Sequence, residues 1–214
     1  MTEEIVVVKI GGSLLLWQDL PKRLQAYLDG LGKAAPVLVV GGGRAADFIR
    51  TLDSVHQIGE SRSHDLALHA LDFTAHVVTS LVDGLVVVTK VDDIQNVWAR
   101  GLIPVFAPRK FLDNEDSNAP RTLKKSWDVT TDSIAARLAE HLDAGRLVLL
   151  KSVDFGGVAN WAEAASAGLV DAAFHEASAS IDCVEFVNLR ADPTSVVRLS
   201  NGLIPLPNNI NTKG

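Results

Sequence analysis

Two apolar segments near the start of the chain each run directly into a cluster of glycines. The first, Ile5–Ile10, is rich in β-branched residues and leads into Gly11-Gly12-Ser13. The second covers residues 36–40 and leads into Gly41-Gly42-Gly43. A nearly continuous apolar run is typical of a strand buried on both faces, as in a parallel sheet covered by helices. This feature predicts an α/β fold.

The rest of the chain alternates in the same way. We expect strands at residues 85–89, 103–106, 147–150 and 184–189, and helices at residues 21–31, 44–52, 61–81, 93–100 and 130–142, with a short helix through Val196. The helix over residues 61–81 is expected to turn Leu66, Ala70, Phe73 and Val77 toward the core. Residues 114–126 are polar and contain Pro120, which predicts a loop. The alternation predicts a three-layer αβα sandwich with a mainly parallel, open sheet, and residues 1–214 are expected to form a single domain.

Composition narrows the classes of partner. Twenty basic and 26 acidic residues give a formal charge of −6, and an acidic chain without a long basic run is a poor candidate for nucleic-acid binding. Cys183 is the only cysteine, which excludes an intrachain disulfide, and we interpret it as a small buried residue in a strand. The start of the sequence is unlike a signal peptide, and the apolar runs are too short to span a membrane. We therefore expect a cytoplasmic globular protein.

The glycine turns are candidate anion sites, because glycine lets backbone N–H groups approach an anion and the next helix adds its dipole. Lys9 stands two residues before Gly11, and a lysine in a buried strand needs an anionic partner. The alternative is a lysine that snorkels to solvent. A Walker A loop is excluded, because neither turn continues into Gly-Lys-Ser/Thr. A dinucleotide-binding turn at Gly41-x-Gly43-x-x-Ala46, with Glu60 downstream, leaves Lys9 unexplained, and the third interpretation is phosphoryl transfer without a P-loop.

Three motifs in this order favour the third interpretation. They are Val8-Lys9-Ile10-Gly11-Gly12-Ser13, Val39-Val40-Gly41-Gly42-Gly43-Arg44 and Val129-Thr130-Thr131-Asp132-Ser133-Ile134-Ala135-Ala136. Together they resemble the signatures of the amino-acid kinase superfamily, over residues 5 to about 202. Residues 98–104, 126–130 and 150–154 are similar to a short branch of that superfamily. The branch contains the kinase that phosphorylates (aminomethyl)furanmethanol phosphate in methanofuran-type one-carbon cofactor synthesis.

The resemblance implies a carbamate kinase-like fold and an ATP-dependent kinase, with Mg²⁺ bridging the phosphates, that acts on a small phosphorylated acceptor. It also implies an N-terminal acceptor lobe of about residues 1–125, a C-terminal nucleotide lobe of about residues 126–214, and a homodimer. The residues that it implies as catalytic are Lys9, Asp132 and Lys151. Those implied at the nucleotide are Gly11, Gly12, Ser13, Lys151, Ser152 and Asp154, and those implied at the acceptor are Gly42, Gly43, Arg44, Thr130 and Thr131.

Within this scheme Lys9 is expected to contact the transferred phosphoryl group and to stabilise negative charge in the transition state. Asp132 would orient the lysines; its alternative is a carboxylate that caps its helix, and one residue can do both. Many superfamily members carry a further lysine after a Gly-Gly pair, but Gly156-Gly157-Val158-Ala159-Asn160 contains none. Either Lys151 replaces that charge, or catalysis is weak, or the chain is a non-catalytic nucleotide or oxyanion binder.

Two groups of polar residues leave alternatives open. The basic residues in or beside the polar loop either face solvent or draw in a phosphorylated substrate; they are Arg109, Lys110, Arg121, Lys124 and Lys125. Four residues share one stripe of the helix over residues 61–81, and they are Asp65, His69, Asp72 and His76. Their spacing permits a metal site, but we favour a solvated polar face or acceptor contacts and assign no metal ligands.

Overall fold

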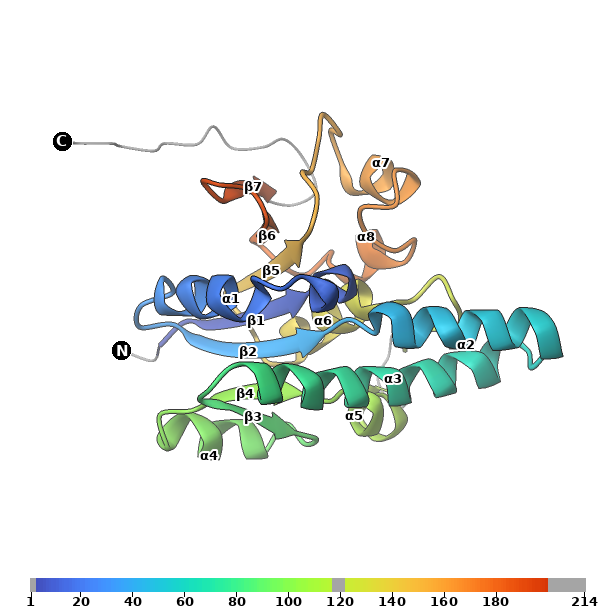
Figure 1. Cartoon of the computed structure of the whole chain (residues 1–214), viewed down its shortest axis with the longest axis horizontal. Helices are drawn as coiled ribbons and strands as arrows, with labels where there is room; N and C mark the ends of the chain where they lie inside the picture. Colours follow the sequence, from blue (N-terminus) through green and yellow to red (C-terminus); the bar gives the residue numbers. More distant parts are fainter. Residues whose placement is uncertain (1–2, 117–121, 200–214) are drawn as a thin grey trace.

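The computed structural model describes residues 3–116 and 122–199. Within these ranges seven strands form one sheet, in the order β3-β4-β2-β1-β5-β6-β7 (Figure 1). The strands are β1 (Ile5–Ile10), β2 (Ala35–Val40), β3 (Leu85–Val88), β4 (Ile103–Phe106), β5 (Arg146–Lys151), β6 (Val184–Asn188) and β7 (Ser195–Leu199). The neighbouring strands are parallel, except that β7 runs antiparallel to β6. The predicted α/β fold with a mainly parallel sheet is confirmed.

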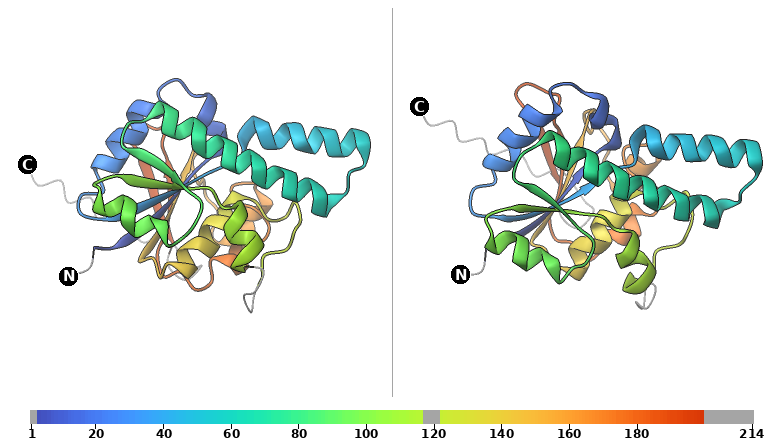
Figure 2. Two further views of the ribbon diagram at one scale, coloured as in Figure 1. Left: turned by 90° about the horizontal axis from the view of Figure 1, so that it is seen from below. Right: turned by 60° about the horizontal axis from the view of Figure 1, so that its bottom comes forward.

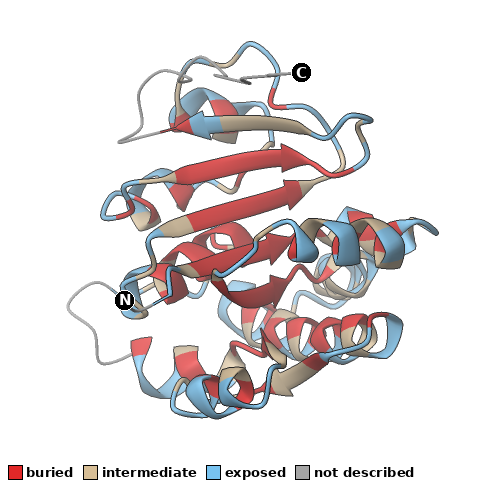
Figure 3. Cartoon of the chain, turned by 90° about the vertical axis from the view of Figure 1, so that its left-hand side faces the viewer, coloured by how far each residue is buried: buried red, intermediate tan, exposed pale blue. Residues whose placement is uncertain are grey.

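Helices cover both faces of the sheet (Figure 2). The described helices are the 3₁₀ helix η1 (Gly12–Leu16), α1 (Leu20–Asp29), α2 (Gly43–His56), α3 (Glu60–Leu81), α4 (Asp93–Ala99), α5 (Arg109–Asn114), α6 (Thr131–His141), α7 (Trp161–Ser166) and α8 (Phe174–Ala177). One core layer packs α1 and the second half of α3 against Val6 and Val8 of β1. The other packs α4, α6, α7 and α8 against Val7 and its neighbours. The central strands are buried along most of their length (Figure 3).

α2 and α3 form an antiparallel pair that extends beyond the edge of the sheet (Figures 1 and 2). No residue of α2 is fully buried, because this helix lies over α3 and away from the sheet. Among the described residues, no helix combines the length and the apolar character that a membrane span requires.

Three expectations about local structure are wrong. Residues 195–199 form the edge strand β7, where a short helix through Val196 was expected. Leu66 and Phe73 are exposed, since α3 presents a different stripe to the core, with Leu68, Leu71, Ala75 and Val78 buried. Cys183 is half-buried and precedes β6 instead of lying within it. Pro120 and Arg121, in the predicted loop, lie outside the described residues.

Candidate active site

Two lysines project from the same face of the sheet, at the carboxyl ends of adjacent strands. Lys9 is the next-to-last residue of β1 and is only 6% exposed. Because side chains alternate along a strand, Lys9 shares the face of Val7, which α6 covers. Lys151 ends β5, two residues after Leu149, which lies on that same face. Both lysines therefore lie over the first turn of α6.

The carboxylate of Asp132, in this first turn, lies between the two ammonium groups. Lys9 Nζ is 2.8 Å from Asp132 Oδ1. Lys151 Nζ donates a hydrogen bond of 2.8 Å to Asp132 Oδ2 and another of 2.7 Å to the backbone oxygen of Leu169. We call these three residues the Lys–Asp–Lys cluster. The anionic partner expected for Lys9 is thus Asp132, and the snorkelling alternative is wrong. Thr130 is the N-cap residue, and Asp132 is the acidic residue of the first turn, where its charge also suits the helix dipole.

The electrostatics of the cluster favour an anion beside it. Burial acts to raise the pKa of Asp132, but the ammonium groups of Lys9 and Lys151 outweigh it and hold that pKa below its usual value. Burial, followed by repulsion from Lys9, lowers the pKa of Lys151 to about 8, against the attraction of Asp132. Two lysines thus face a single carboxylate in a largely desolvated place. A phosphoryl group that carries negative charge would be stabilised there.

The two glycine turns pack against each other, backbone to backbone, beside this cluster. A Cβ atom added at Gly12 would lie 2.3 Å from the backbone nitrogen of Gly43, and one added at Gly43 would lie 2.6 Å from the oxygen of Gly12. Gly43 also has a φ of +50°, which disfavours other residues. The N–H of Gly11 donates a hydrogen bond of 2.8 Å to the backbone oxygen of Leu150. It is therefore not free to bind a nucleotide phosphate, contrary to the prediction. Glycine is required here by the contact between the turns.

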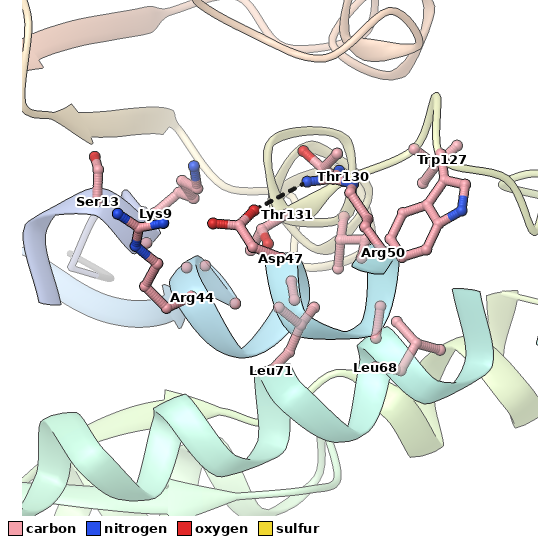
Figure 4. A pocket seen from close by; sticks show the side chains of 18 of the residues that line it. Lys9, Ser13, Arg44, Asp47, Arg50, Leu68, Leu71, Trp127, Thr130 and Thr131 are labelled. Carbon is pink, nitrogen blue, oxygen red and sulfur yellow. Dashed lines mark hydrogen bonds and ion pairs between the residues drawn. The ribbon is translucent and has the colours of Figure 1, made fainter. Parts of the chain in front are cut away.

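A cleft of about 690 Å³ opens where the turns meet (Figure 4). Lys9, Ser13 and Arg44 lie toward one end of it, and Arg50 and Trp127 toward the other. Of the predicted residues, those that line this cleft are Lys9, Gly12, Ser13, Gly42, Gly43, Arg44, Thr130 and Thr131. The predicted phosphate and acceptor motifs, far apart in the sequence, therefore line a common cavity.

Lys151, Ser152 and Asp154, which were also predicted at the nucleotide, do not line the cleft. Ser152 Oγ is 2.9 Å from Ser13 Oγ, which links the end of β5 to the first glycine turn. Asp154 accepts a hydrogen bond of 3.0 Å from the amide nitrogen of Asn188. Lys151 pairs instead with Asp132 of the Lys–Asp–Lys cluster.

Several lining residues were missed from the sequence. Arg50 lies over the ring of Trp127, with its guanidinium carbon 4.7 Å from the ring centroid. Trp127 is held in place by hydrogen bonds from its indole nitrogen to Asp53 (3.2 Å) and from its backbone nitrogen to Glu60 (3.1 Å). Glu60 is thus engaged by Trp127, which removes the acidic residue on which the dinucleotide interpretation depended. Arg190, after β6, also lines the cleft.

Two of the basic residues in or beside the predicted loop, Arg109 and Lys125, form ion pairs. Arg109 Nε is 3.1 Å from Asp72 Oδ2, and Lys125 Nζ is 2.9 Å from Asp65 Oδ1. The polar stripe of α3 thus supplies ion pairs. Among the described residues, no group of three or more His, Cys, Asp or Glu side chains is arranged to hold a metal ion.

Comparison with known proteins gives the class. The model of the amino acid kinase family matches residues 4–160. The chain therefore belongs to the amino acid kinase family, a class of ATP-dependent small-molecule kinases. This confirms the resemblance predicted from the glycine and Asp132 motifs.

The individual relatives share only a low sequence identity with this chain. The chain is 28% identical over 149 residues to (5-(aminomethyl)furan-3-yl)methyl phosphate kinase of Methanocaldococcus jannaschii. The match covers 69% of this chain and 66% of that kinase, slightly under two thirds of its length.

Solved structures of the same class share the fold. Aspartate kinase from Synechocystis matches with a TM-score of 0.61 at 16% identity, over 94% of this chain and 41% of that one. The UMP kinase from Bacillus anthracis matches with a TM-score of 0.58 at 15% identity, over 89% of each chain.

Proposed function

We propose that this protein transfers the γ-phosphoryl group of ATP to a small phosphorylated acceptor. The observation that carries the proposal is the buried Lys–Asp–Lys cluster, of which Lys9 lines a cleft where two glycine turns meet. Phosphoryl transfer requires in-line positioning and neutralisation of charge more than covalent participation by the protein. A pair of desolvated ammonium groups supplies that neutralisation.

Each element of the site has a role in this scheme. Lys9 contacts the oxygens of the transferred group, Asp132 fixes both lysines, and Lys151 supplies the charge that is missing after Gly157. The nucleotide phosphates lie at the turn of Gly12 and Ser13, on the side of Ser152 and Asp154. About residues 126–214 form the nucleotide lobe and about residues 1–125 the acceptor lobe.

Magnesium fits this site as a partner of the nucleotide. Mg²⁺ usually keeps several waters and binds through substrate phosphates with one or two carboxylates. The only carboxylate of the cluster is already engaged by two lysines, so the phosphates would carry most of the coordination. When bound, the ion would neutralise charge on the β- and γ-phosphates.

The first acceptor to test is (5-(aminomethyl)furan-3-yl)methyl phosphate, the compound in the name of the M. jannaschii relative. Arg44, in the first turn of α2, lines the cleft and would hold an acceptor phosphate by two parallel hydrogen bonds. The apolar side chains of Leu68, Leu71 and Ile134 line the same cleft and suit a small ring. This acceptor would place the protein in methanofuran-type cofactor synthesis.

The alternative is a non-catalytic binder of nucleotides or oxyanions. The absence of a lysine in Gly157-Val158-Ala159-Asn160 favours it. ADP release with a panel of phosphorylated acceptors, compared with ATP binding by calorimetry, separates the two functions. We expect ADP release that requires an acceptor. ATP binding without turnover on any acceptor would support the alternative.

The Lys9→Met variant tests the proposed centre directly. We expect it to fold normally and to lose turnover by several orders of magnitude, because the transferred group loses its closest cation. The matched control is Lys22→Met, which removes an exposed lysine from α1. Unchanged turnover in Lys9→Met would show that the phosphates bind elsewhere.

We also propose that the protein is a cytoplasmic homodimer that associates through the acceptor lobe. Large apolar side chains are exposed on the α2–α3 pair; they are Phe48 (62%), Val55 (68%), Leu66 (42%) and Phe73 (59%). Exposed apolar groups of this size favour association. Sedimentation of Phe73→Asp is expected to show monomer where the unchanged protein shows dimer. A monomer in both would contradict this part of the proposal.

A further inference from the structure

The first turn of α6, which carries Asp132, is held by a residue from a distant part of the chain. The N-cap residue Thr130 makes no capping hydrogen bond with its own side chain. Asp171 supplies the acceptor: its Oδ2 atom accepts from Thr130 N at 2.9 Å, from Thr130 Oγ1 at 2.8 Å and from Ser133 N at 3.0 Å. Its Oδ1 atom accepts from Ser133 Oγ. One carboxylate thus binds the residues on both sides of Asp132.

The segment that carries Asp171 also holds Lys151. The backbone oxygen of Leu169, two residues before Asp171, accepts a hydrogen bond of 2.7 Å from Lys151 Nζ. Gly168, at the start of the segment, lines the cleft. Residues 168–171 therefore contact the cleft, one lysine of the cluster and the helix turn that carries its carboxylate.

These contacts restrain the cluster more than a local cap would. A serine or threonine N-cap satisfies one or two backbone N–H groups at its own helix end. The carboxylate of Asp171 takes four hydrogen bonds, two of them from side chains, and charge-assisted bonds are the stronger kind. Burial and then the nearby charge of Asp132 raise the pKa of Asp171, while the donors of Ser133 and Thr130 oppose that rise.

We propose that Asp171 is a positioning residue for phosphoryl transfer, which sets the place of Asp132 and, through it, of Lys9 and Lys151. The proposal rests on the proposed function only for its effect on turnover. Asp171 acts on the cluster without touching the reacting atoms. Its loss should therefore change the rate of the chemical step and the titration of Lys151 more than the binding of ATP.

The test compares Asp171→Ala and Asp171→Asn with Glu185→Gln. Asparagine keeps an oxygen for the backbone donors and an amide for Ser133, so it should retain most of the geometry. Glu185 is the matched control, because it is another buried carboxylate (4% exposed) with several partners, here Arg146 and Arg198. It lies near the start of β6, at the end of the sheet opposite the cleft.

We expect Asp171→Ala to lower kcat at least 30-fold while KM for ATP changes less than threefold, and Asp171→Asn to stay within about fivefold of the unchanged protein. Glu185→Gln should leave kcat within twofold even if it lowers Tm as much. An equal fall of kcat in Asp171→Ala and Glu185→Gln would overturn the proposal, since it would show general destabilisation.

A second readout does not need turnover. NMR titration of ¹³C-labelled lysine, with Lys151 assigned from Lys151→Met, gives its pKa in each folded variant. We expect this pKa to fall in Asp171→Ala, because Asp132 and the Leu169 oxygen are displaced, and to stay unchanged in Glu185→Gln. An unchanged pKa of Lys151 in Asp171→Ala would contradict the proposal. If Asp171→Ala does not fold, the same measurement is made on Asp171→Ser. Absence of turnover in the unchanged protein would count against the proposed function alone.

Discussion

Replacing Gly12 by alanine probes the contact between the two glycine turns. The added Cβ atom would lie 2.3 Å from Gly43 N, 2.6 Å from Gly43 Cα and 3.2 Å from Gly41 C. Ordinary contacts of this kind begin at 3.4 Å, so the turns must separate by 3.4 − 2.3, about 1.1 Å. All three atoms belong to the backbone, and no change of rotamer can relieve the clash.

The expected cost follows from this geometry. Overpacking that shifts the backbone costs about 1–3 kcal/mol, and in a chain of this size each kcal/mol lowers Tm by about 2–4 °C. We therefore expect Gly12→Ala to lower Tm by roughly 2–12 °C. Turnover should fall further, by on the order of 100-fold, because a displacement of about 1 Å in the positioning groups has that effect.

Thermal unfolding and steady-state kinetics measure both effects. Gly157→Ala is the matched control for stability, because a Cβ atom there meets nothing within 4 Å and the residue does not have a positive φ. It should be neutral or stabilising by up to about 1 kcal/mol, through the entropy of the unfolded chain. If Gly12→Ala kept the Tm and the kcat/KM of the unchanged protein, the close packing of the turns would be refuted.

Two further predictions concern the cluster. Asp132→Asn leaves two buried ammonium groups without their carboxylate, so chemical denaturation should show a loss of about 3–5 kcal/mol; a loss below about 1 kcal/mol would show that the pairs are exposed to water. The pKa of Lys151 is about 8 in the folded protein, so kcat/KM should fall as pH rises through about 8, and Lys151→Arg should remove that fall. Because the unfolded chain keeps this proton to about pH 10.4, it binds more protons than the folded chain above pH 8, and stability gains with rising pH. From pH 8 to 9.5 the unchanged protein should therefore gain stability relative to Lys151→Met, and no relative gain would contradict the burial of Lys151.

The sequence predicted the parts of the fold that depend on local pattern. The apolar run Ile5–Ile10 and the glycines after it identify a buried parallel strand and its turn. Lys9 could be assigned an anionic partner because a charge in such a strand must be paired. Its partner, Asp132, came from resemblance and not from local pattern, since the two are brought together only by packing of α6 against the sheet.

Other features had weaker local signals. α3 carries apolar residues on two sides, so periodicity did not decide between the side of Phe73 and the side of Leu71. Residues 195–199 are a short segment of mixed polarity, Ser-Val-Val-Arg-Leu, for which helix and edge strand cannot be separated by periodicity.

Part of the site depends on long-range contacts. Trp127 is fixed by Asp53 and Glu60, which are distant in the sequence, and Asp171 is distant from the helix turn that it holds. No motif marks Asp53 or Asp171. Their contacts form only when the tertiary structure places donors of one segment beside acceptors of another.

The most direct measurement is a crystal structure with a non-hydrolysable ATP analogue and magnesium. The account predicts the terminal phosphate within hydrogen-bond distance of Lys9 Nζ, with a neighbouring phosphate against the backbone N–H groups of the Gly12 turn. A triphosphate bound away from the cluster, with Lys9 still paired only to Asp132, would contradict it.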